Sequence, residues 1–302
     1  MVPQRLRIAT RGSRLARWQA ETVRTMLTER HPSLKVDLVI ITSQGDVNRT
    51  DPLHKIGGMG LFTKEVQDAV LDGRADVAVH SLKDLPTETP QELVLASVPA
   101  RGPTEDALLA PLHRTFERLP TAARVATSSL RRRAQLLRRR SDLQIVDVRG
   151  NVETRVRKLL DGEFDAMVLA AAGLERLELS DHVTERFNPD QMLPAVGQGA
   201  LGVECRTDDA ATRLLLVEID HAETHRAVAA ERMFLKTLQG GCQLPIAALA
   251  TASGQHLRLR GNVTARDGSE QFSGEAEGDD PSTVGRELAE ELLSQGARRL
   301  LV

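Results

Sequence analysis

The feature of this sequence that most constrains its fold is a strand–helix–strand pattern that runs through the first part of the chain and then starts again. Short apolar runs typical of strands alternate with segments whose apolar residues recur at helical spacing. The first stretch predicts strands at 6–10, 35–41 and 75–79, a helix at 61–71 and a helix capped by Ser13. Such alternation is typical of a parallel sheet with helices on its faces.

The first predicted helix carries a recurring set of apolar residues. These residues, which recur at helical spacing, are Leu15, Trp18, Val23, Met26 and Leu27. Residues 42–60, in contrast, show no periodicity and contain four glycines. A loop of this length inside a compact domain is unusual unless it has a function, so we expect it to act as a lid.

The strand–helix pattern restarts after the proline- and glycine-bearing segment Pro99–Pro103. This second stretch predicts strands at 124–127, 143–148 and 166–170 and helices at 130–140 and 151–160. Residues 193–205 are expected to form a connection that returns to a strand. The sequence therefore predicts a second α/β unit.

The pattern changes beyond about residue 218. A long helix is predicted at 224–238, a strand with alternating polarity at 256–260 and an amphipathic helix at 283–293. We therefore expect a third, smaller domain of α+β type.

Composition excludes several classes of protein. With 302 residues, of which 41% are hydrophobic and 27% charged, the chain is an ordinary globular protein with more than one domain. The longest apolar run, Ala166–Leu174, is too short to cross a membrane, and the first residues lack a signal-peptide pattern. A net charge of −2 and the near absence of aromatic residues argue against nucleic-acid binding. We expect a cytoplasmic protein that binds neither nucleic acid nor membranes.

Three predicted strand-to-helix junctions combine a helix-capping residue with arginine. They are Thr10–Ser13, Thr127–Arg132, and Arg149–Asn151 with Arg155 one turn later. A helix N-terminus already carries positive partial charge, so an arginine there is unfavourable unless an anion joins it. Because ligands bind at the carboxyl ends of parallel strands, we interpret these junctions as an anion site, strongest at Arg131 and Arg132. The alternative is incidental surface charge.

The predicted turn after the strand at 75–79 carries His80, Lys83 and Asp84. Asp84 and Lys83 could form a simple ion pair that closes the turn. A carboxylate that faces an arginine-lined site could instead exchange a proton and stabilise a cationic intermediate. His80, at the end of an apolar strand, is expected to be structural.

The two cysteines lie in different surroundings, and their number fits a reducing compartment. Cys205 ends an apolar strand and is expected to be packed. Cys242 lies in a loop with two glycines, where covalent chemistry is as plausible as no role at all. The sequence has no metal-ligand spacing, and Gly57–Gly60 lacks the lysine and hydroxyl residue of a phosphate-binding loop.

Several motifs together identify a resemblance. They are Arg7–Ser13, Lys55–Phe62, Val79–Pro86, Thr127–Arg132, Val148–Asn151, Leu193–Gly199, and Glu231 with Gly240–Pro245. Over essentially its whole length the chain resembles the porphobilinogen deaminase family, also called hydroxymethylbilane synthase.

The resemblance implies a transferase of tetrapyrrole (haem) biosynthesis. Four molecules of porphobilinogen would be joined head to tail with loss of ammonia, and the linear tetrapyrrole hydroxymethylbilane would be released by hydrolysis. It also implies a dipyrromethane cofactor, built from the enzyme's own substrate and held as a thioether on Cys242. The pyrroles carry acetate and propionate groups, which explains a site rich in arginine.

The resemblance also implies which residues act. Asp84 would be the catalytic carboxylate, protonating the departing amine and stabilising the cationic azafulvene. The implied cofactor-binding residues are Cys242, Lys83, Asp84, Thr127, Ser128, Ser129, Arg131, Arg132, Gly150 and Gly173. The implied substrate-binding residues are Arg11, Ser13, Lys55, Arg149, Arg155, Arg176 and Gln198.

The family's architecture implies two α/β domains that resemble the lobes of periplasmic binding proteins and a smaller α+β domain. The implied boundaries are 1–99 with 200–217, then 100–199, then 218–302 with the cysteine loop, in a monomer. One departure is Met59, where many bacterial relatives carry lysine. A reading of another class is a non-catalytic, two-lobed organic-anion-binding protein, against which the missing signal-peptide pattern and Cys242 argue.

Overall fold

The computed structural model describes residues 3–42, 63–240 and 244–301. Internal contacts divide the chain into two compact units. Unit 1 comprises Met1–Asp51, Ile56–Gly102 and Ala200–His225, and unit 2 comprises Pro52–Lys55, Pro103–Gly199 and Arg226–Val302. The expected division into three domains stays a prediction.

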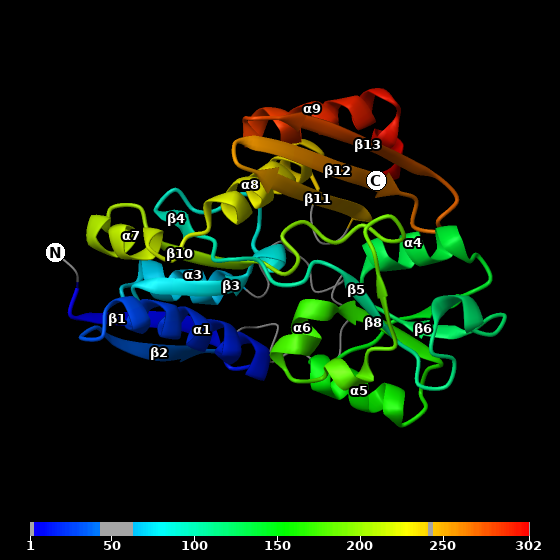
Figure 1. The fold of residues 1–302 in the computed structure, drawn as a ribbon, viewed down its shortest axis with the longest axis horizontal. Helices are drawn as coiled ribbons and strands as arrows, with labels where there is room; N and C mark the ends of the chain where they lie inside the picture. Colours follow the sequence, from blue (N-terminus) through cyan, green and yellow to red (C-terminus); the bar gives the residue numbers. More distant parts are fainter. Residues whose placement is uncertain (1–2, 43–62, 241–243, 302) are drawn as a thin grey trace. The chain divides into compact units, whose positions relative to one another are not determined.

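Unit 1 is built on a five-stranded sheet in the order β2-β1-β3-β10-β4 (Figure 1). The strands are β1 (Arg5–Arg11), β2 (Lys35–Ile41), β3 (Val77–Ser81), β4 (Leu93–Ser97) and β10 (Leu201–Arg206). Its helices are α1 (Arg14–Arg30), α3 (Lys64–Leu71) and α7 (Ala210–Val217), and the 3-10 turn η1 spans Leu82–Asp84. Strands β1, β2 and β3 are parallel, but β10 runs antiparallel to β3 and β4.

The predicted parallel arrangement is confirmed for β1, β2 and β3, and β10 makes the sheet of unit 1 mixed. Strand β10 is buried at its first five positions. A continuously apolar strand is typical of any strand covered on both faces, and its direction leaves no trace in the pattern. The predicted strands at 6–10, 35–41 and 75–79 are confirmed within two residues at either end.

Helix α1 shows how the sequence defines one face of unit 1. The Ser13 hydroxyl accepts a hydrogen bond from the Ala16 amide at 3.2 Å, so the predicted cap is confirmed. Ala20, Val23 and Leu27 are fully buried in the same core cluster. Trp18, one of the apolar residues that recur at helical spacing, is 39% exposed. It lies two positions from both Ala16 and Ala20, and at 100° per residue this places it on the opposite side of the helix.

Unit 2 contains a second five-stranded sheet in the order β7-β6-β8-β5-β9. The strands are β5 (Asp106–Leu109), β6 (Arg124–Ala126), β7 (Gln144–Val146), β8 (Ala166–Ala170) and β9 (Glu185–Phe187). Helices α4 (Leu130–Arg139), α5 (Val152–Leu160) and α6 (Ala171–Arg176) follow β6, β7 and β8, with 3-10 turns η2 (Phe116–Arg118) and η3 (Ser180–His182). Strand β5 is antiparallel to both of its neighbours, so this sheet too is mixed rather than parallel.

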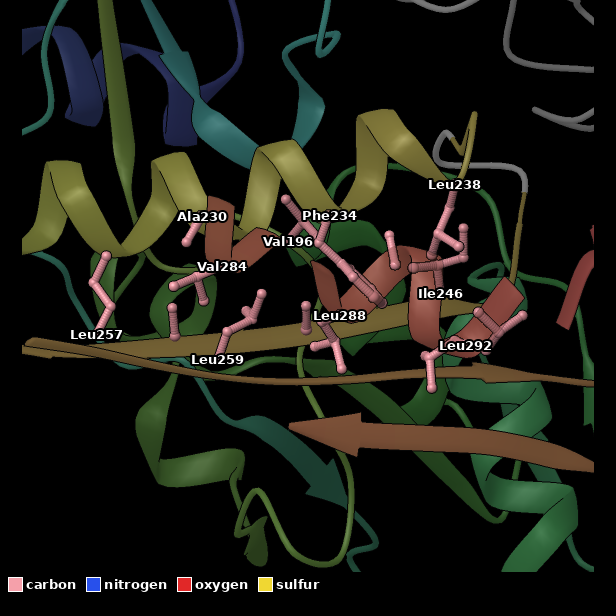
Figure 2. Close-up of a cluster of buried hydrophobic side chains, with 14 of the residues drawn as sticks. Val196, Ala230, Phe234, Leu238, Ile246, Leu257, Leu259, Val284, Leu288 and Leu292 are labelled. Carbon is pink, nitrogen blue, oxygen red and sulfur yellow. The ribbon is translucent and has the colours of Figure 1, made fainter. Parts of the chain in front are cut away.

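The rest of unit 2 is a three-stranded antiparallel sheet of β11 (Ile246–Ser253), β12 (His256–Thr264) and β13 (Gln271–Gly278). Helices α8 (Ala222–Thr237) and α9 (Pro281–Ser294) share one apolar core with it, and the 3-10 turn η4 spans Ala297–Leu300. Figure 2 shows Phe234 of α8 and Leu288 of α9 beside Leu259 of β12. The α/β class with a smaller α+β part is thus confirmed.

Within the described part of the chain, no helix is both long enough and apolar enough to cross a membrane.

Candidate active site

In unit 1 the candidate site lies where β1 and β3 end. These strands are parallel neighbours, so their carboxyl ends meet at one edge of the sheet. Strand β1 ends at Arg11, and Ser13 caps the helix that follows. Strand β3 ends at Ser81, and the turn η1 then carries Lys83 and Asp84. The sheet therefore brings residues 70 positions apart in the sequence to one place.

A pocket of about 70 Å³ lies at this edge, and its lining includes Arg11, Ser13, Ser81 and Asp84. Gln19 also lines it and donates a 2.6 Å hydrogen bond from its amide to the Ser81 hydroxyl. A guanidinium, a carboxylate and hydroxyls together can hold an anionic group beside a cationic one.

A buried polar cluster, which the sequence did not predict, adjoins this pocket. His80 lines the pocket and is 5% exposed, and its Nε2 lies 3.0 Å from Oε2 of the fully buried Glu204. This close contact does not form a hydrogen bond. Gln67 donates to both oxygens of Glu204, at 3.0 and 3.2 Å. His80 is thus packed as expected, and the missed signal was a glutamate inside an otherwise apolar strand.

In unit 2, the junction between β6 and α4 is formed by three hydroxyl residues. Ser129 caps α4 and accepts from the Arg132 amide at 3.4 Å. Ser128 donates to the carbonyl of Val148 at 2.5 Å and accepts from its amide at 3.1 Å. Thr127 accepts from the Ser129 amide through its hydroxyl. These bonds join the start of α4 to the chain that leaves β7.

Arg131 and Arg132 are buried, at 4% and 7% exposure, around the fully buried Asp106. Arg131 donates to both carboxylate oxygens of Asp106, at 2.7 and 3.2 Å, and Arg132 Nε donates to one at 2.8 Å. Burial raises the pKa of Asp106, but the two arginine charges outweigh it and hold the pKa well below its usual range. Arginines at a helix N-terminus need an anion nearby, and the Asp106 carboxylate supplies at least part of it.

Gln198 belongs to the same cluster. It is fully buried, and its amide donates to the Thr104 carbonyl at 2.7 Å and to Asp106 at 3.0 Å. Arg132 also donates to the Val168 carbonyl at 3.2 Å. Gln198, predicted to bind substrate, thus lies beside the two arginines.

The junction between β7 and α5 holds a second set of predicted residues. Asn151 caps α5 by accepting from the Thr154 amide at 2.9 Å. Gly150 has φ of +115°, and a Cβ there would lie 2.7 Å from a Thr154 methyl group, so glycine is required. Arg155 donates to the Gly150 carbonyl at 2.8 Å.

Arg149 stands out among the charged residues of this junction. Its Nε and Nη2 atoms are buried, and neither has a hydrogen-bond partner among residues 3–42, 63–240 and 244–301. Buried donors without an acceptor are rare in proteins and call for an explanation such as a bound ion. Nε and Nη2 form one edge of the guanidinium, which is suited to receive a carboxylate through two parallel bonds.

The other predicted residues of unit 2 lie on α6. Gly173 is in the middle of this helix and Arg176 ends it. Arg176 donates to the Gly199 carbonyl at 2.6 Å. Burial lowers the pKa of Arg176, against a smaller opposing effect of Glu175.

Two predicted site residues, Cys242 and Lys55, lie outside the described residues, as does the predicted lid with Met59. Cys205 is fully buried, and burial raises the pKa of its thiol to about 11, with a smaller contribution from Asp209. Because the thiolate is the reactive form, Cys205 is poorly suited to covalent chemistry. The expectation that it is packed is confirmed.

Each unit therefore has its own polar site. Unit 1 combines Arg11, Ser13 and Asp84 in one pocket, where an anion can be bound and a proton held or moved. Unit 2 has arginines at the N-termini of α4 and α5. Two of the buried donors of Arg149 have no acceptor within the described residues.

Two family models match the chain. One, described as "Porphobilinogen deaminase, dipyromethane cofactor binding domain", matches residues 6–214, and "Porphobilinogen deaminase, C-terminal domain" matches residues 225–294. Curated relatives carry the name porphobilinogen deaminase. The protein from Syntrophotalea carbinolica is 51% identical over 298 residues, covering 98% of this chain and 95% of the relative. That from Trichlorobacter lovleyi is 48% identical over 303 residues, covering 100% and 97%.

Solved structures similar in fold include two periplasmic proteins. The VFT2 domain of Bordetella pertussis BvgS is 12% identical with a TM-score of 0.42, covering 72% of this chain and 86% of that domain. The aliphatic sulphonate-binding protein SsuA from Escherichia coli is 15% identical with a TM-score of 0.39, covering 78% and 71%.

Proposed function

This chain belongs to the porphobilinogen deaminase family, and from that premise we propose that it joins four porphobilinogen molecules head to tail, releasing ammonia at each step and hydroxymethylbilane at the end. The observation that carries the proposal is the pocket of unit 1, which places Asp84 and Arg11 at the ends of parallel strands. Porphobilinogen carries two carboxylates and an aminomethyl group, so it offers an anion for Arg11 and a cation for Asp84.

The residues of unit 2 fit the dipyrromethane cofactor named by the family model. The buried Nε and Nη2 of Arg149 and the buried Nε of Arg131, which have no partner within residues 3–42, 63–240 and 244–301, are donors suited to carboxylates such as acetate and propionate groups. Arg131, Arg132 and Arg149 would hold these carboxylates beside Ser129, and Cys242 would hold the group as a thioether. When bound, the cofactor supplies the pyrrole carbon to which the first substrate is joined.

Asp84 acts on the leaving amine. The aminomethyl group of the substrate is protonated near neutral pH, so the Asp84 carboxylate accepts hydrogen bonds from this ammonium and from the pyrrole N–H. As the carbon–nitrogen bond breaks, the electron pair leaves with ammonia and the positive charge passes to the ring. A carboxylate beside the ring stabilises that charge. Arg11, Ser13 and Lys83 orient the substrate's carboxylates, which places the reacting carbon.

The remaining predicted residues extend this arrangement. Arg155, Arg176 and Gln198 contribute to binding the growing chain, whose carboxylates increase with each added ring. Thr127, Ser128, Gly150 and Gly173 shape the cofactor site. Location in the cytoplasm and a monomeric state are part of the same proposal. The alternative of a non-catalytic anion-binding protein is not favoured by the relatives, which are named as deaminases.

The test is the intact mass of the purified protein before and after incubation with porphobilinogen. We expect an excess of two linked pyrroles over the mass of the sequence, followed by stepwise addition of single pyrroles and release of ammonia. Protein that carries the excess but neither gains pyrroles nor releases ammonia would refute the activity. A protein that remains at its bare mass after exposure to substrate would refute the cofactor as well.

A further inference from the structure

Asp106 is the first residue of β5 and lies at the centre of the most charged cluster buried within unit 2. It is fully buried and receives four hydrogen bonds at 2.7–3.2 Å, from Arg131, Arg132 and Gln198. Neither the family motifs nor the charge pattern pointed to this residue. Its partners, in contrast, are three of the residues that the resemblance assigns to the binding of cofactor or substrate.

The backbone of Asp106 is held firmly in the sheet. It pairs with Ala170 of β8 on one side and with Phe187 of β9 on the other. This pairing fixes the position of the Asp106 backbone, and its short side chain leaves the carboxylate little freedom to move. Arg131 and Arg132, in contrast, reach the cluster through long side chains from the first turn of α4. Asp106 is therefore the fixed element, and the two arginines are arranged around it.

The positive and negative charges of this buried cluster do not cancel. Two guanidinium groups face one carboxylate, which leaves one positive charge in excess. Arg131 is 4% exposed, and its Nε is buried with no hydrogen-bond partner in the described ranges. Its Nη1, by comparison, donates to both Asp106 and the Leu193 carbonyl. One positive charge in excess and one buried donor without a partner in the described ranges are thus the features that suit an external carboxylate.

We propose that Asp106 is a positioning residue that holds Arg131 and Arg132 in one arrangement before an anionic group arrives, so that the pair receives a carboxylate of the dipyrromethane. The inference rests on the proposed function, because it concerns how the cofactor site is prepared. Without the Asp106 charge, two neighbouring guanidinium groups would repel each other and turn toward solvent. The carboxylate would then meet arginines that must first be ordered, at a cost in side-chain entropy.

The test compares variants that alter the charge of Asp106 or only its position. Asp106→Asn removes the charge at constant size, and Asp106→Glu keeps the charge but moves it by one methylene group. The control is Asp142→Asn, which breaks another arginine–aspartate contact next to α4, the 2.6 Å pair with Arg140 at the partly exposed end of the helix. Full-length proteins are produced in cells that cannot make porphobilinogen and checked for folding by circular dichroism. The appearance of the two-pyrrole mass is then followed at several porphobilinogen concentrations.

We expect the Asp106 variants that fold to acquire the cofactor about 10²-fold more slowly than the unaltered chain, as for a binding group misplaced by about 1 Å. We also expect a higher half-saturating concentration of porphobilinogen, while Asp142→Asn behaves like the unaltered chain. A folded Asp106 variant with normal assembly kinetics would overturn the proposal. Failure of both variants to fold would also overturn it, because the carboxylate would then serve the core. Failure of the unaltered chain to acquire the two-pyrrole mass would refute the proposed function instead.

Discussion

Replacing Arg149 by methionine should lower activity without lowering stability. The Nε and Nη2 atoms of Arg149 are buried and lack acceptors within the described residues. An unsatisfied buried donor costs about 1–3 kcal/mol. Arg149→Met keeps a long side chain and removes these donors. The free energy of unfolding should therefore stay the same or rise, by up to about 1–3 kcal/mol.

The loss of binding can be worked out from the same two atoms. A hydrogen bond to a charged group contributes about 1.5–3 kcal/mol, so two bonds to one carboxylate contribute about 3–6 kcal/mol. At about 1.4 kcal/mol for each factor of ten, kcat/KM for porphobilinogen should fall roughly 10²–10⁴-fold. Few substitutions of a charged residue combine a neutral effect on stability with a loss of this size.

Urea unfolding of the cofactor-free protein and steady-state release of ammonia by the holoenzyme measure the two effects. The matched control is Arg140→Met, because Arg140 donates to both oxygens of Asp142 and to the carbonyls of Leu119 and Pro120. That variant should lower stability by about 1–3 kcal/mol and leave kcat/KM unchanged. The reasoning is refuted if Arg149→Met lowers stability as much as the control does, or if its kcat/KM is normal.

Three further outcomes follow from the site. Cys242→Ser should fold but show no two-pyrrole mass excess, whereas Cys205→Ser should retain it, and an excess on the first variant would remove Cys242 from the mechanism. Asp84→Asn should keep the excess while ammonia release falls roughly 10²–10³-fold, as for loss of one group that stabilises developing charge; a near-normal rate would assign the amine to another residue. Because the folded-state pKa of Asp106 is lowered, its ionised carboxylate contributes stability that is present above its unfolded pKa of about 4 and is lost as pH falls toward the folded pKa. Urea midpoints measured below pH 4 should therefore fall less steeply for Asp106→Asn, and parallel curves for the two proteins would contradict this.

The sequence predicted the secondary structure well where apolar periodicity and capping agree. The strand Lys35–Ile41 and the strand Ala166–Ala170 have the predicted bounds, and α1 begins directly after Ser13. Strand direction could not be predicted in the same way. Leu201–Arg206 is buried along nearly its whole length, and such a run pairs equally well with parallel or antiparallel neighbours. The sequence therefore did not predict that both five-stranded sheets are mixed.

The candidate site was predicted through residues whose chemistry shows in local sequence. A serine or asparagine before a helix, with arginine beside it, is visible in a few consecutive letters, and Ser129 and Asn151 cap helices as expected. Asp106 and Glu204 were missed because their partners are distant in the sequence. Asp106 is 25 residues from Arg131, and Glu204 is 137 residues from Gln67. A lone carboxylate in an apolar strand indicates a buried polar cluster. Its partners cannot be identified from the sequence, because only the folded sheet brings them together.

The buried cluster also changes how substitutions of the paired arginines must be interpreted. An arginine at the start of a helix needs an anion, and that argument led to Arg131 and Arg132. Because Asp106 already supplies an anion, Arg131→Leu would leave a carboxylate buried beside a single arginine, and breaking a buried pair costs about 3–5 kcal/mol. Loss of cofactor in that variant would report stability and binding together. Arg149→Met separates the two, because Arg149 has no acceptor in the described part of the chain to lose. Anion recognition is therefore best measured at Arg149, and the preparation of the site at Asp106.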